Sequence, residues 1–216
     1  MRAALFALSV GITQPGLVNA QTELSVYGGL ERSADSQVSG RDPLNSGAFS
    51  FTSAWDDQSL TDAANYGLRV TWWQNDSVGW GLAYSRSSMR ADDGVLSDNN
   101  LTSMNFSDGL NLFTLNAFRR WPGAIEGVTP YVGGGIGFAV PRIDYGTGTS
   151  RTSEYQVTGP ALNWMAGASY PLNETLSVFG EYQGSYSVNS FDLQGGGNLD
   201  TRILTGAVNL GLSLGF

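Results

Sequence analysis

The last eight residues, NLGLSLGF (residues 209–216), decide the fold class. Counting from Val208, every second residue is apolar as far as Phe216, and the residues between them are small or polar. A period of two indicates a strand with two unlike faces. Chain ends usually fray unless something holds them. A strand that runs to the final phenylalanine therefore predicts a sheet that binds its own last residue.

Seven other segments alternate in the same way. Large apolar side chains occupy one face of each segment, and glycine, alanine, serine, asparagine and isolated charges occupy the other. These segments are residues 23–30, 64–73, 78–85, 109–121, 130–140, 161–170 and 175–188. Together with the C-terminal strand they predict eight strands.

The connections alternate between short and long. Short turns are expected at residues 74–77, 122–127 and 171–174, and long polar stretches lie at 32–63, 88–109, 141–158 and 189–201. This plan is typical of outer-membrane barrels. The sequence therefore predicts an all-β fold, an eight-stranded antiparallel transmembrane β-barrel with short periplasmic turns and long extracellular loops. Closure would pair the last strand with the first, near Leu24, and leave no open edge.

A soluble eight-stranded barrel of the lipocalin kind is the alternative, and its apolar face would point inward. Here the small and polar face suits a narrow interior, and the face rich in Leu, Val, Trp and Tyr suits lipid. Aromatic residues are expected toward the strand ends, as in interfacial belts, namely Trp72, Trp80, Tyr84, Trp164 and Tyr170. The pattern favours a barrel in the outer membrane of a Gram-negative bacterium.

Composition excludes several kinds of site. The 216 residues include no cysteine and no histidine, so a disulfide, a Cys/His zinc site and a Ser/His/Asp triad are all impossible. The net charge of −8 argues against nucleic acid as a partner. All eleven basic residues are arginine.

Residues 1–20 have the pattern of a secretory signal peptide. Arg2 precedes a short apolar stretch, and small residues stand at the expected cleavage position, Val18-Asn19-Ala20. The expected mature chain, residues 21–216, is one outer-membrane β-barrel domain.

Six polar residues are expected to face the lumen near mid-strand: Arg69, Glu181, Asn116, Asn163, Asn209 and Gln183. Buried charges need partners, so an Arg69–Glu181 pair within a packed polar core is the simplest interpretation. The functional alternative is that a desolvated Glu181 serves as an acid or base.

Arginines lie at the outward strand ends and in the long loops, and the loops also carry carboxylates. Arg86, Arg142 and Arg202 are expected to contact the phosphates of lipopolysaccharide, because guanidinium groups bind phosphate bidentately. Loop carboxylates could hold a divalent metal ion. No spacing matches an EF-hand, however, and solvated loop charge is the competing interpretation. GGGIG at residues 133–137 lies in a strand pattern, which favours close packing of the wall over a nucleotide site.

Several segments together resemble one known family. They are TELSVYGG, YGLRVTWW, SDGLNLFTLNAFRRWP, TPYVGGGIGFAVP, YQVTGPALNWMAGASYPLN, VFGEYQGSYS and GGGNLDTRILTGAVNLGLSLGF. In their order and in their residues they resemble the outer-membrane lipid A oxidases of alphaproteobacteria, over nearly all of residues 21–216. The resemblance implies oxidation of the proximal glucosamine of lipid A to 2-aminogluconate, with O2 as co-substrate.

The resemblance also suggests roles for residues. Glu181, Glu154 and Tyr155 lie in matching segments and are candidate catalytic bases, while Arg142 and Arg202 would hold a phosphate or the sugar. Any redox metal would have to be held by carboxylates, tyrosines and amides, because histidine and cysteine are absent.

Two other functions stay open. One is a non-catalytic, OmpA-like barrel with a structural or ligand-binding role, and the other is a small pore, although eight strands usually leave no aqueous path. The expected partners are outer-membrane lipid, lipopolysaccharide and the barrel-assembly machinery, which would recognise Phe216. A monomer is expected.

Overall fold

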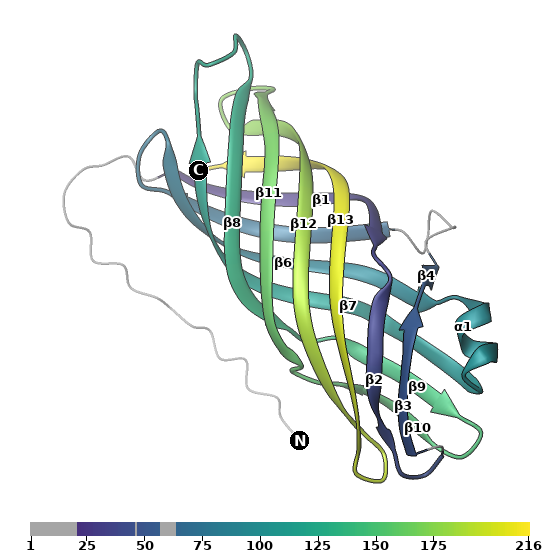
Figure 1. The fold of residues 1–216 in the computed structure, drawn as a ribbon. Coiled ribbons are helices and arrows are strands. Elements are labelled where there is room, and N and C mark those ends of the chain that lie inside the picture. The colour runs from purple at the N-terminus through teal and green to yellow at the C-terminus, as the bar shows by residue number, and fades with distance from the viewer. Residues whose placement is uncertain (1–20, 46, 57–63) are drawn as a thin grey trace, which may run out of the picture.

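The computed structural model describes residues 21–45, 47–56 and 64–216 (Figure 1). The described part contains thirteen strands and one short helix. No helix among these residues is long and apolar enough to cross a membrane. The predicted signal peptide, residues 1–20, lies outside the described residues.

Eight of the strands form the barrel wall. In order around the wall they are β1 (Gln21–Ser33), β5 (Ala64–Trp73), β6 (Val78–Ala91), β7 (Leu101–Arg120), β8 (Thr129–Ala139), β11 (Gly159–Pro171), β12 (Leu176–Leu193) and β13 (Gly197–Gly215). Each pairs antiparallel with its neighbours, and β13 pairs with β1 to close the ring, Leu24 standing opposite Leu214. The predicted eight-stranded barrel is confirmed.

The seam between β13 and β1 holds the C-terminal residue in the sheet, as the sequence predicted. The backbone N–H of Thr22 donates to the carbonyl of Phe216 at 3.0 Å, and the N–H of Phe216 donates to the carbonyl of Thr22 at 2.9 Å. The final residue is therefore part of the ladder, and no edge is left at the seam.

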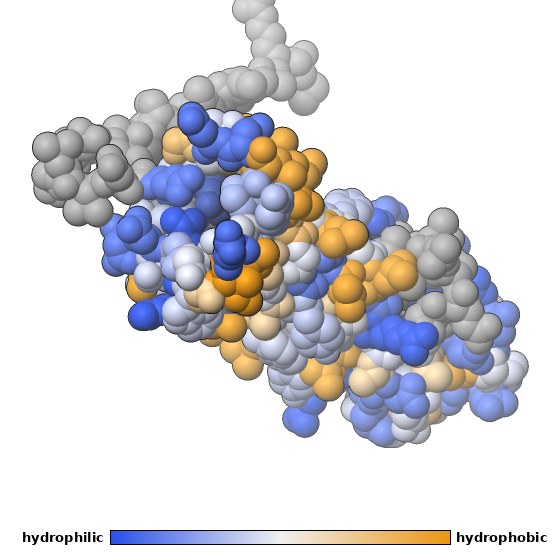
Figure 2. Space-filling model, turned by 90° about the horizontal axis from the view of Figure 1, so that it is seen from above, coloured by the Kyte–Doolittle hydropathy of each residue, from blue (hydrophilic) through white to orange (hydrophobic). Residues whose placement is uncertain are grey.

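The barrel is apolar outside and polar inside. Its outward face carries half-exposed apolar side chains on every wall strand, among them Leu30, Leu68, Leu82, Leu115, Ile136, Leu162, Tyr182 and Leu210. Its inward face buries serine, threonine, asparagine, arginine and glutamate. Orange, hydrophobic side chains are accordingly exposed on the surface in Figure 2. This arrangement is that of a transmembrane β-barrel of the outer-membrane type, and not that of a soluble barrel.

One end of the barrel has the short turns that were predicted. Gln74 and Leu172 each close a turn by donating a backbone hydrogen bond across it, to Val78 and Leu176. Short turns face the periplasm in barrels of this type, so this is the periplasmic end.

The opposite, extracellular end continues beyond the membrane as a β-structure. The additional elements are β2 (Ser36–Asp42), β3 (Gly47–Ser53), β4 (Trp55–Asp56), α1 (Asp93–Asp98), β9 (Arg142–Thr147) and β10 (Arg151–Tyr155). The β2–β3 hairpin pairs with the extracellular end of β13, and the β9–β10 hairpin pairs with the extracellular end of β7. The predicted long loops are therefore largely strands, gathered at the lower right of Figure 1.

A hydrophobic core fills this extracellular extension. Val38 of β2, Phe106 of β7, Ile143 of β9, Phe191 of β12 and Leu199 of β13 are all almost completely buried in one cluster. The cluster closes the extracellular end of the lumen with apolar side chains. These segments were predicted as loops because their solvent-facing residues are polar and most of their strands are short.

The glycines of GGGIG make room inside the barrel wall, as the sequence indicated. A Cβ at Gly133 would lie 2.6 Å from the ring of Phe118. At Gly135 a Cβ would collide with Asn116, and at Gly137 it would collide with the backbone of Phe113. Close packing, and not a phosphate site, explains this run.

Candidate functional site

The lumen holds the ion pair that the sequence suggested. Arg69 Nη2 lies 3.0 Å from Glu181 Oε2, and the hydroxyl of Tyr131 donates to the same oxygen at 2.7 Å. The guanidinium carbon of Arg69 lies 5.2 Å from the ring centre of Phe118 and 5.3 Å from that of Phe179. Both charges are almost fully buried, so each depends on the other and on these neighbours for its stability.

The four amides expected in the lumen also point inward. Asn209 donates to Gln183 Oε1 at 3.0 Å, while Asn116 and Asn163 donate to the hydroxyl of Thr114 at 3.0 Å and 3.3 Å. All six lumen residues therefore lie where the sequence placed them, in a packed polar core. A small cavity of about 40 Å³ reaches Arg69 from the periplasmic side.

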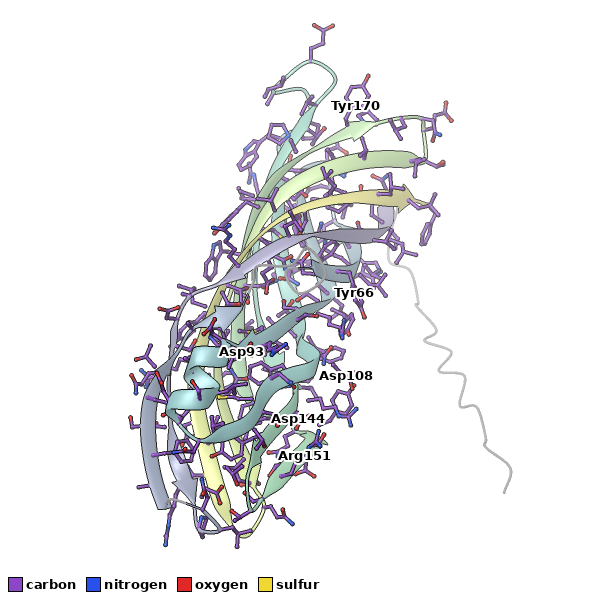
Figure 3. The ribbon with its side chains drawn as sticks, turned by 90° about the vertical axis from the view of Figure 1, so that its right-hand side faces the viewer. Tyr66, Asp93, Asp108, Asp144, Arg151 and Tyr170 are labelled. Carbon is purple, nitrogen blue, oxygen red and sulfur yellow. The ribbon has the colours of Figure 1, made fainter. Side chains whose placement is uncertain are left out.

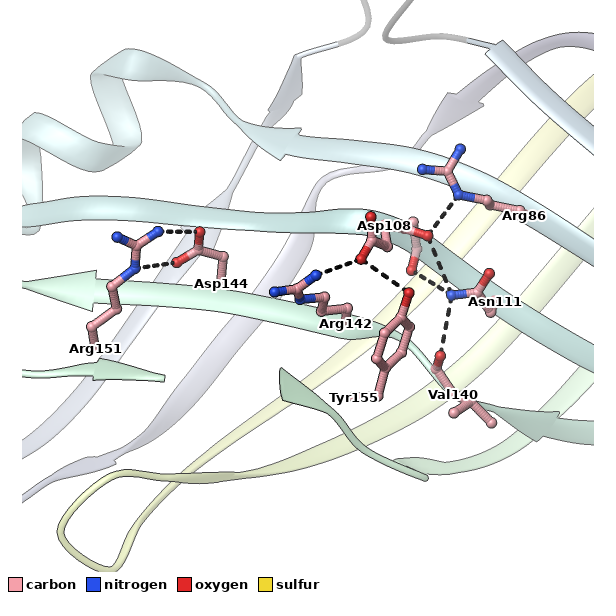
Figure 4. A network of polar contacts seen from close by, with 9 residues as sticks. Arg86, Asp108, Asn111, Val140, Arg142, Asp144, Arg151 and Tyr155 are labelled. Carbon is pink, nitrogen blue, oxygen red and sulfur yellow. Dashed lines mark hydrogen bonds and ion pairs between the residues drawn. The ribbon is translucent and has the colours of Figure 1, made fainter. Parts of the chain in front are cut away.

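A second polar group lies outside the barrel, at its extracellular rim (Figure 4). We call Arg86, Asp108, Asn111, Arg142 and Tyr155 the rim cluster. Arg142 Nη1 and the hydroxyl of Tyr155 both donate to Asp108 Oδ2, at 2.7 Å and 3.0 Å. Arg86 Nε donates to the Asp108 carbonyl at 2.6 Å. Asn111 Nδ2 contacts the carbonyls of Asp108, Gly109 and Val140 at 3.2–3.3 Å.

A local irregularity of β7 builds the rim cluster. The register between β6 and β7 shifts between Ser87 and Met89, where β7 passes through residues 107–109. Gly109 has φ of +84°, a conformation that L side chains rarely adopt, and a Cβ there would lie 2.7 Å from Arg86 Cγ. The bulge therefore turns Asp108 outward and lets Arg86 lie against the chain.

The hydrogen bonds within the rim cluster keep Asp108 ionised and Tyr155 neutral. Hydrogen bonds from Arg142 and Tyr155 lower the pKa of Asp108. The bond to Asp108 raises the pKa of Tyr155, so its phenol stays neutral and acts as a donor. Two arginines and one carboxylate leave the cluster with one net positive charge. Asp144 and Arg151 form a neutral pair beside it, with contacts of 2.8 Å and 3.1 Å.

The rim cluster lies on one side of the molecule. Asp108, Asp144 and Arg151 follow the same edge as Tyr66 in Figure 3, and Tyr170 lies at the far, periplasmic end. The Arg86 guanidinium lies 5.4 Å from the ring centre of Tyr66. The cluster thus stands directly above the apolar, membrane-facing wall of β5, β6 and β7.

The structure places the three candidate catalytic bases in different parts of the molecule. Glu181 is shut inside the lumen, whereas Tyr155 lies outside at the rim, and the carboxylate of Glu154 accepts a bond from Gln156 at 3.0 Å. The three candidate bases therefore do not form one site. The physical reason is that Glu181 faces inward on a wall strand, while Glu154 and Tyr155 belong to a hairpin above the membrane.

The three predicted phosphate-binding arginines are also divided. Arg86 and Arg142 meet at Asp108, but Arg202 is exposed on β13. Three wall strands separate β13 from β7 in either direction around the barrel. Arg202 therefore lies on the opposite wall and cannot share a ligand with the rim cluster.

Carboxylates do not gather into a metal-binding cluster in the part of the chain that the structure describes. No three His, Cys, Asp or Glu side chains of residues 21–45, 47–56 and 64–216 lie close enough to hold a metal ion. Asp57, another loop carboxylate of the sequence, lies outside this part of the chain.

The sequence prediction overlooked Asp108 and Asn111 as organisers of the rim. In the sequence, Asp108 is one of several carboxylates of the long polar stretches, at the end of the one predicted at 88–109. The signal that marks it is the break in alternation at Ser107-Asp108-Gly109, between two alternating segments, because such a break with glycine indicates a bulge.

Comparisons with known proteins give similar folds but no family. No family model matches the chain, and no curated protein matches it. Neisserial surface protein A is 13% identical, with a TM-score of 0.49 over 90% of this chain and 97% of that chain. The N-terminal β-barrel domain of Pseudomonas aeruginosa OprF is 16% identical, with a TM-score of 0.45 over 92% of this chain and 100% of that chain. The outer membrane protein OprG from the same organism is 15% identical, with a TM-score of 0.45 over 89% of this chain and 95% of that chain. Likenesses at this level say nothing about activity, and the barrel architecture stands on its own strand pairing.

Proposed function

We propose that this outer-membrane barrel acts on lipid A, the phosphorylated glycolipid of the outer leaflet. The supporting observation is the rim cluster, in which Arg86 and Arg142 flank one carboxylate and leave one net positive charge. The cluster lies at the extracellular end of the lipid-facing wall, where we expect the lipid head groups. Planar guanidinium groups suit the bidentate binding of phosphate.

The finer part of the proposal is the reaction that the sequence resemblance implies. Loss of two electrons and two protons at C1 of the free proximal glucosamine gives a lactone, and O2 takes them up as hydrogen peroxide. Water then opens the lactone to 2-aminogluconate. Tyr155 donates its one O–H to Asp108, so its phenol oxygen would accept from a sugar hydroxyl and orient the sugar. The other oxygen of the Asp108 carboxylate would accept the hydroxyl proton at C1.

One observation favours the alternative, a structural or ligand-binding barrel without catalysis. The Asp108 carboxylate has a lowered pKa because Arg142 and Tyr155 bond to it, and a lowered pKa weakens a general base. Binding of lipid A is common to both functions, whereas oxidation belongs to the first alone.

The test is expression of the full chain in a host whose lipid A lacks its 1-phosphate, followed by mass spectrometry of the lipid A. An oxidase produces a species with one extra oxygen on the proximal sugar, and only in air. Arg86→Gln/Arg142→Gln should lower the yield at least about threefold, because exposed ionic contacts with the phosphate are lost. Arg202→Gln, on the opposite wall, is the matched control and should leave the yield unchanged.

Unchanged lipid A would overturn the oxidation, provided that the barrel is folded in the membrane. Folding is checked by heat-modifiable migration in a gel. Equal loss in the double variant and in Arg202→Gln would contradict the assignment of the rim cluster.

A further inference from the structure

A hollow lies on the lipid-facing wall beneath the rim cluster. We call it the wall hollow; it spans β5, β6, β7 and β8, with Leu68 and Val70 of β5 at one side, and has a volume of about 570 Å³. The residues that shape it here are Tyr84, Phe113 and Phe138 above, and Leu82, Leu115 and Ile136 below. All of the lower three expose about half or more of their surface.

The strand register builds the wall hollow as two rows. Tyr84, Phe113 and Phe138 stand opposite one another, with ring centres 5.1 Å and 5.6 Å apart. The lower row is formed in the same way, since Leu82 pairs with Leu115 and Leu115 with Ile136. An aromatic row therefore lies above an aliphatic row, and the space between them opens toward lipid.

The wall hollow and the rim cluster are continuous. Arg86 follows Tyr84 by two residues on β6, and Asn111 precedes Phe113 by two on β7, a separation of about 7 Å along a strand. The Tyr84 hydroxyl donates to Asn111 Oδ1 at 2.7 Å and connects the two. A lipid whose phosphate lies at the two arginines would have its chain beside the aromatic row.

We propose that the wall hollow binds an acyl chain of a phosphorylated outer-leaflet lipid whose phosphate lies at Arg86 and Arg142. The occupant follows from the charge: one net positive charge above an open apolar hollow complements an anionic head group with a hydrocarbon chain. This inference deepens the proposed function and rests on its binding step. It assigns the chain-contacting residues, on which lipid selectivity would depend.

The experiment uses the folded barrel in phosphatidylcholine vesicles that contain a little phosphatidic acid with a photoreactive diazirine in one acyl chain. Cross-linked residues are mapped by mass spectrometry. Phosphatidic acid should label the wall hollow about threefold more than the outward face of β13, the ratio expected for one exposed ionic contact. The same diazirine chain on phosphatidylcholine should label both walls alike.

Three variants separate the contribution of the phosphate contact from that of the acyl-chain contact. Arg86→Gln/Arg142→Gln should abolish the enrichment at the wall hollow, and Leu115→Trp, which fills the hollow, should reduce it. Leu210→Trp is the matched control, because Leu210 is an exposed, lipid-facing leucine on the opposite wall. Heat-modifiable migration shows that each variant is folded.

Labelling that is equal around the barrel for both lipids would overturn the proposal, since it would show only bulk lipid. The oxidation assay is independent of this result. Enrichment without oxidation supports the wall hollow and overturns the oxidase, whereas oxidation without enrichment does the reverse.

Discussion

A single carboxylate, that of Asp108, connects side chains from two hairpin strands at the outer rim. Arg142 of β9 and Tyr155 of β10 both donate to it, and Arg86 of β6 bonds to its carbonyl. The residue types alone do not indicate this role, since other loop aspartates of the chain look the same in sequence. Its function as an organiser comes from the bulge at residues 107–109, which turns it toward the hairpin.

The lowered pKa of Asp108 gives a prediction about pH. Because the pKa is lower in the folded state, the carboxylate stabilises the rim at pH values above the ordinary aspartate range. This contribution is lost as the pH falls through the lowered pKa. A carbon-13 NMR titration of Asp108 in micelles should show a midpoint below the ordinary aspartate value.

Arg142→Gln is the matched variant for this titration. Arg142 is the largest cause of the shift, so its loss should move the midpoint of Asp108 back toward the ordinary value. A wild-type midpoint at or above the ordinary value would contradict the bonding described for the rim.

At the scale of elements, the strands of the wall serve two environments. β12 and β13 begin or end in lipid and continue into the extracellular extension, where Phe191, Leu199 and Ile203 are buried. In the membrane their large apolar residues face outward, and beyond it they face inward. The face of each strand that carries the large apolar residues therefore switches from outward to inward at the membrane surface, where water replaces lipid.

Leu199→Ala tests whether the extracellular extension is a true core. Leu199 is fully buried, so the truncation should cost about 2–5 kcal/mol and loosen the β2–β3 hairpin, which pairs with this part of β13. Limited proteolysis should then cut the extension faster, while the barrel keeps its heat-modifiable migration. Leu214→Ala, on the lipid-facing side of the same strand, is the control and should not change the cleavage rate. Equal cleavage of the two variants would refute a packed extracellular core.

At the scale of the whole molecule, the barrel separates two surfaces. The inner surface carries a buried ion pair and amides, and the outer surface carries the lipid-facing band and the rim cluster. The extracellular core covers the lumen at one end. A ligand from the outer leaflet therefore meets the outer wall, and Glu181 lies beyond its reach.

Tryptophan fluorescence can test this inside-out arrangement. Trp164 is lipid-facing with 42% of its surface exposed, whereas Trp55 is buried in the extracellular core. Brominated acyl chains should therefore quench much of the fluorescence of the folded barrel in vesicles. Trp164→Phe should reduce the quenched fraction more than Trp55→Phe does. The opposite order would mean that the faces of the wall are reversed.

The sequence by itself determined the barrel, its eight wall strands and the lumen. An alternating pattern has only two faces, so Arg69 and Glu181 could be assigned to the interior and Leu210 to lipid without any coordinates. Closure follows as well, because a strand that ends at Phe216 needs a partner and the first strand supplies it. These features depend on periodicity, which is local.

The tertiary structure alone decided which residues meet at the rim. Arg142 and Tyr155 reach Asp108 only because the β9–β10 hairpin folds back onto β7, while Arg202 is carried to the opposite wall by the order of the strands. Such encounters join segments far apart in the chain, and no local pattern encodes them. The physical reason is that a period of two assigns each side chain to a face, whereas its neighbours on that face are set by strand register and by the bulge that shifts it.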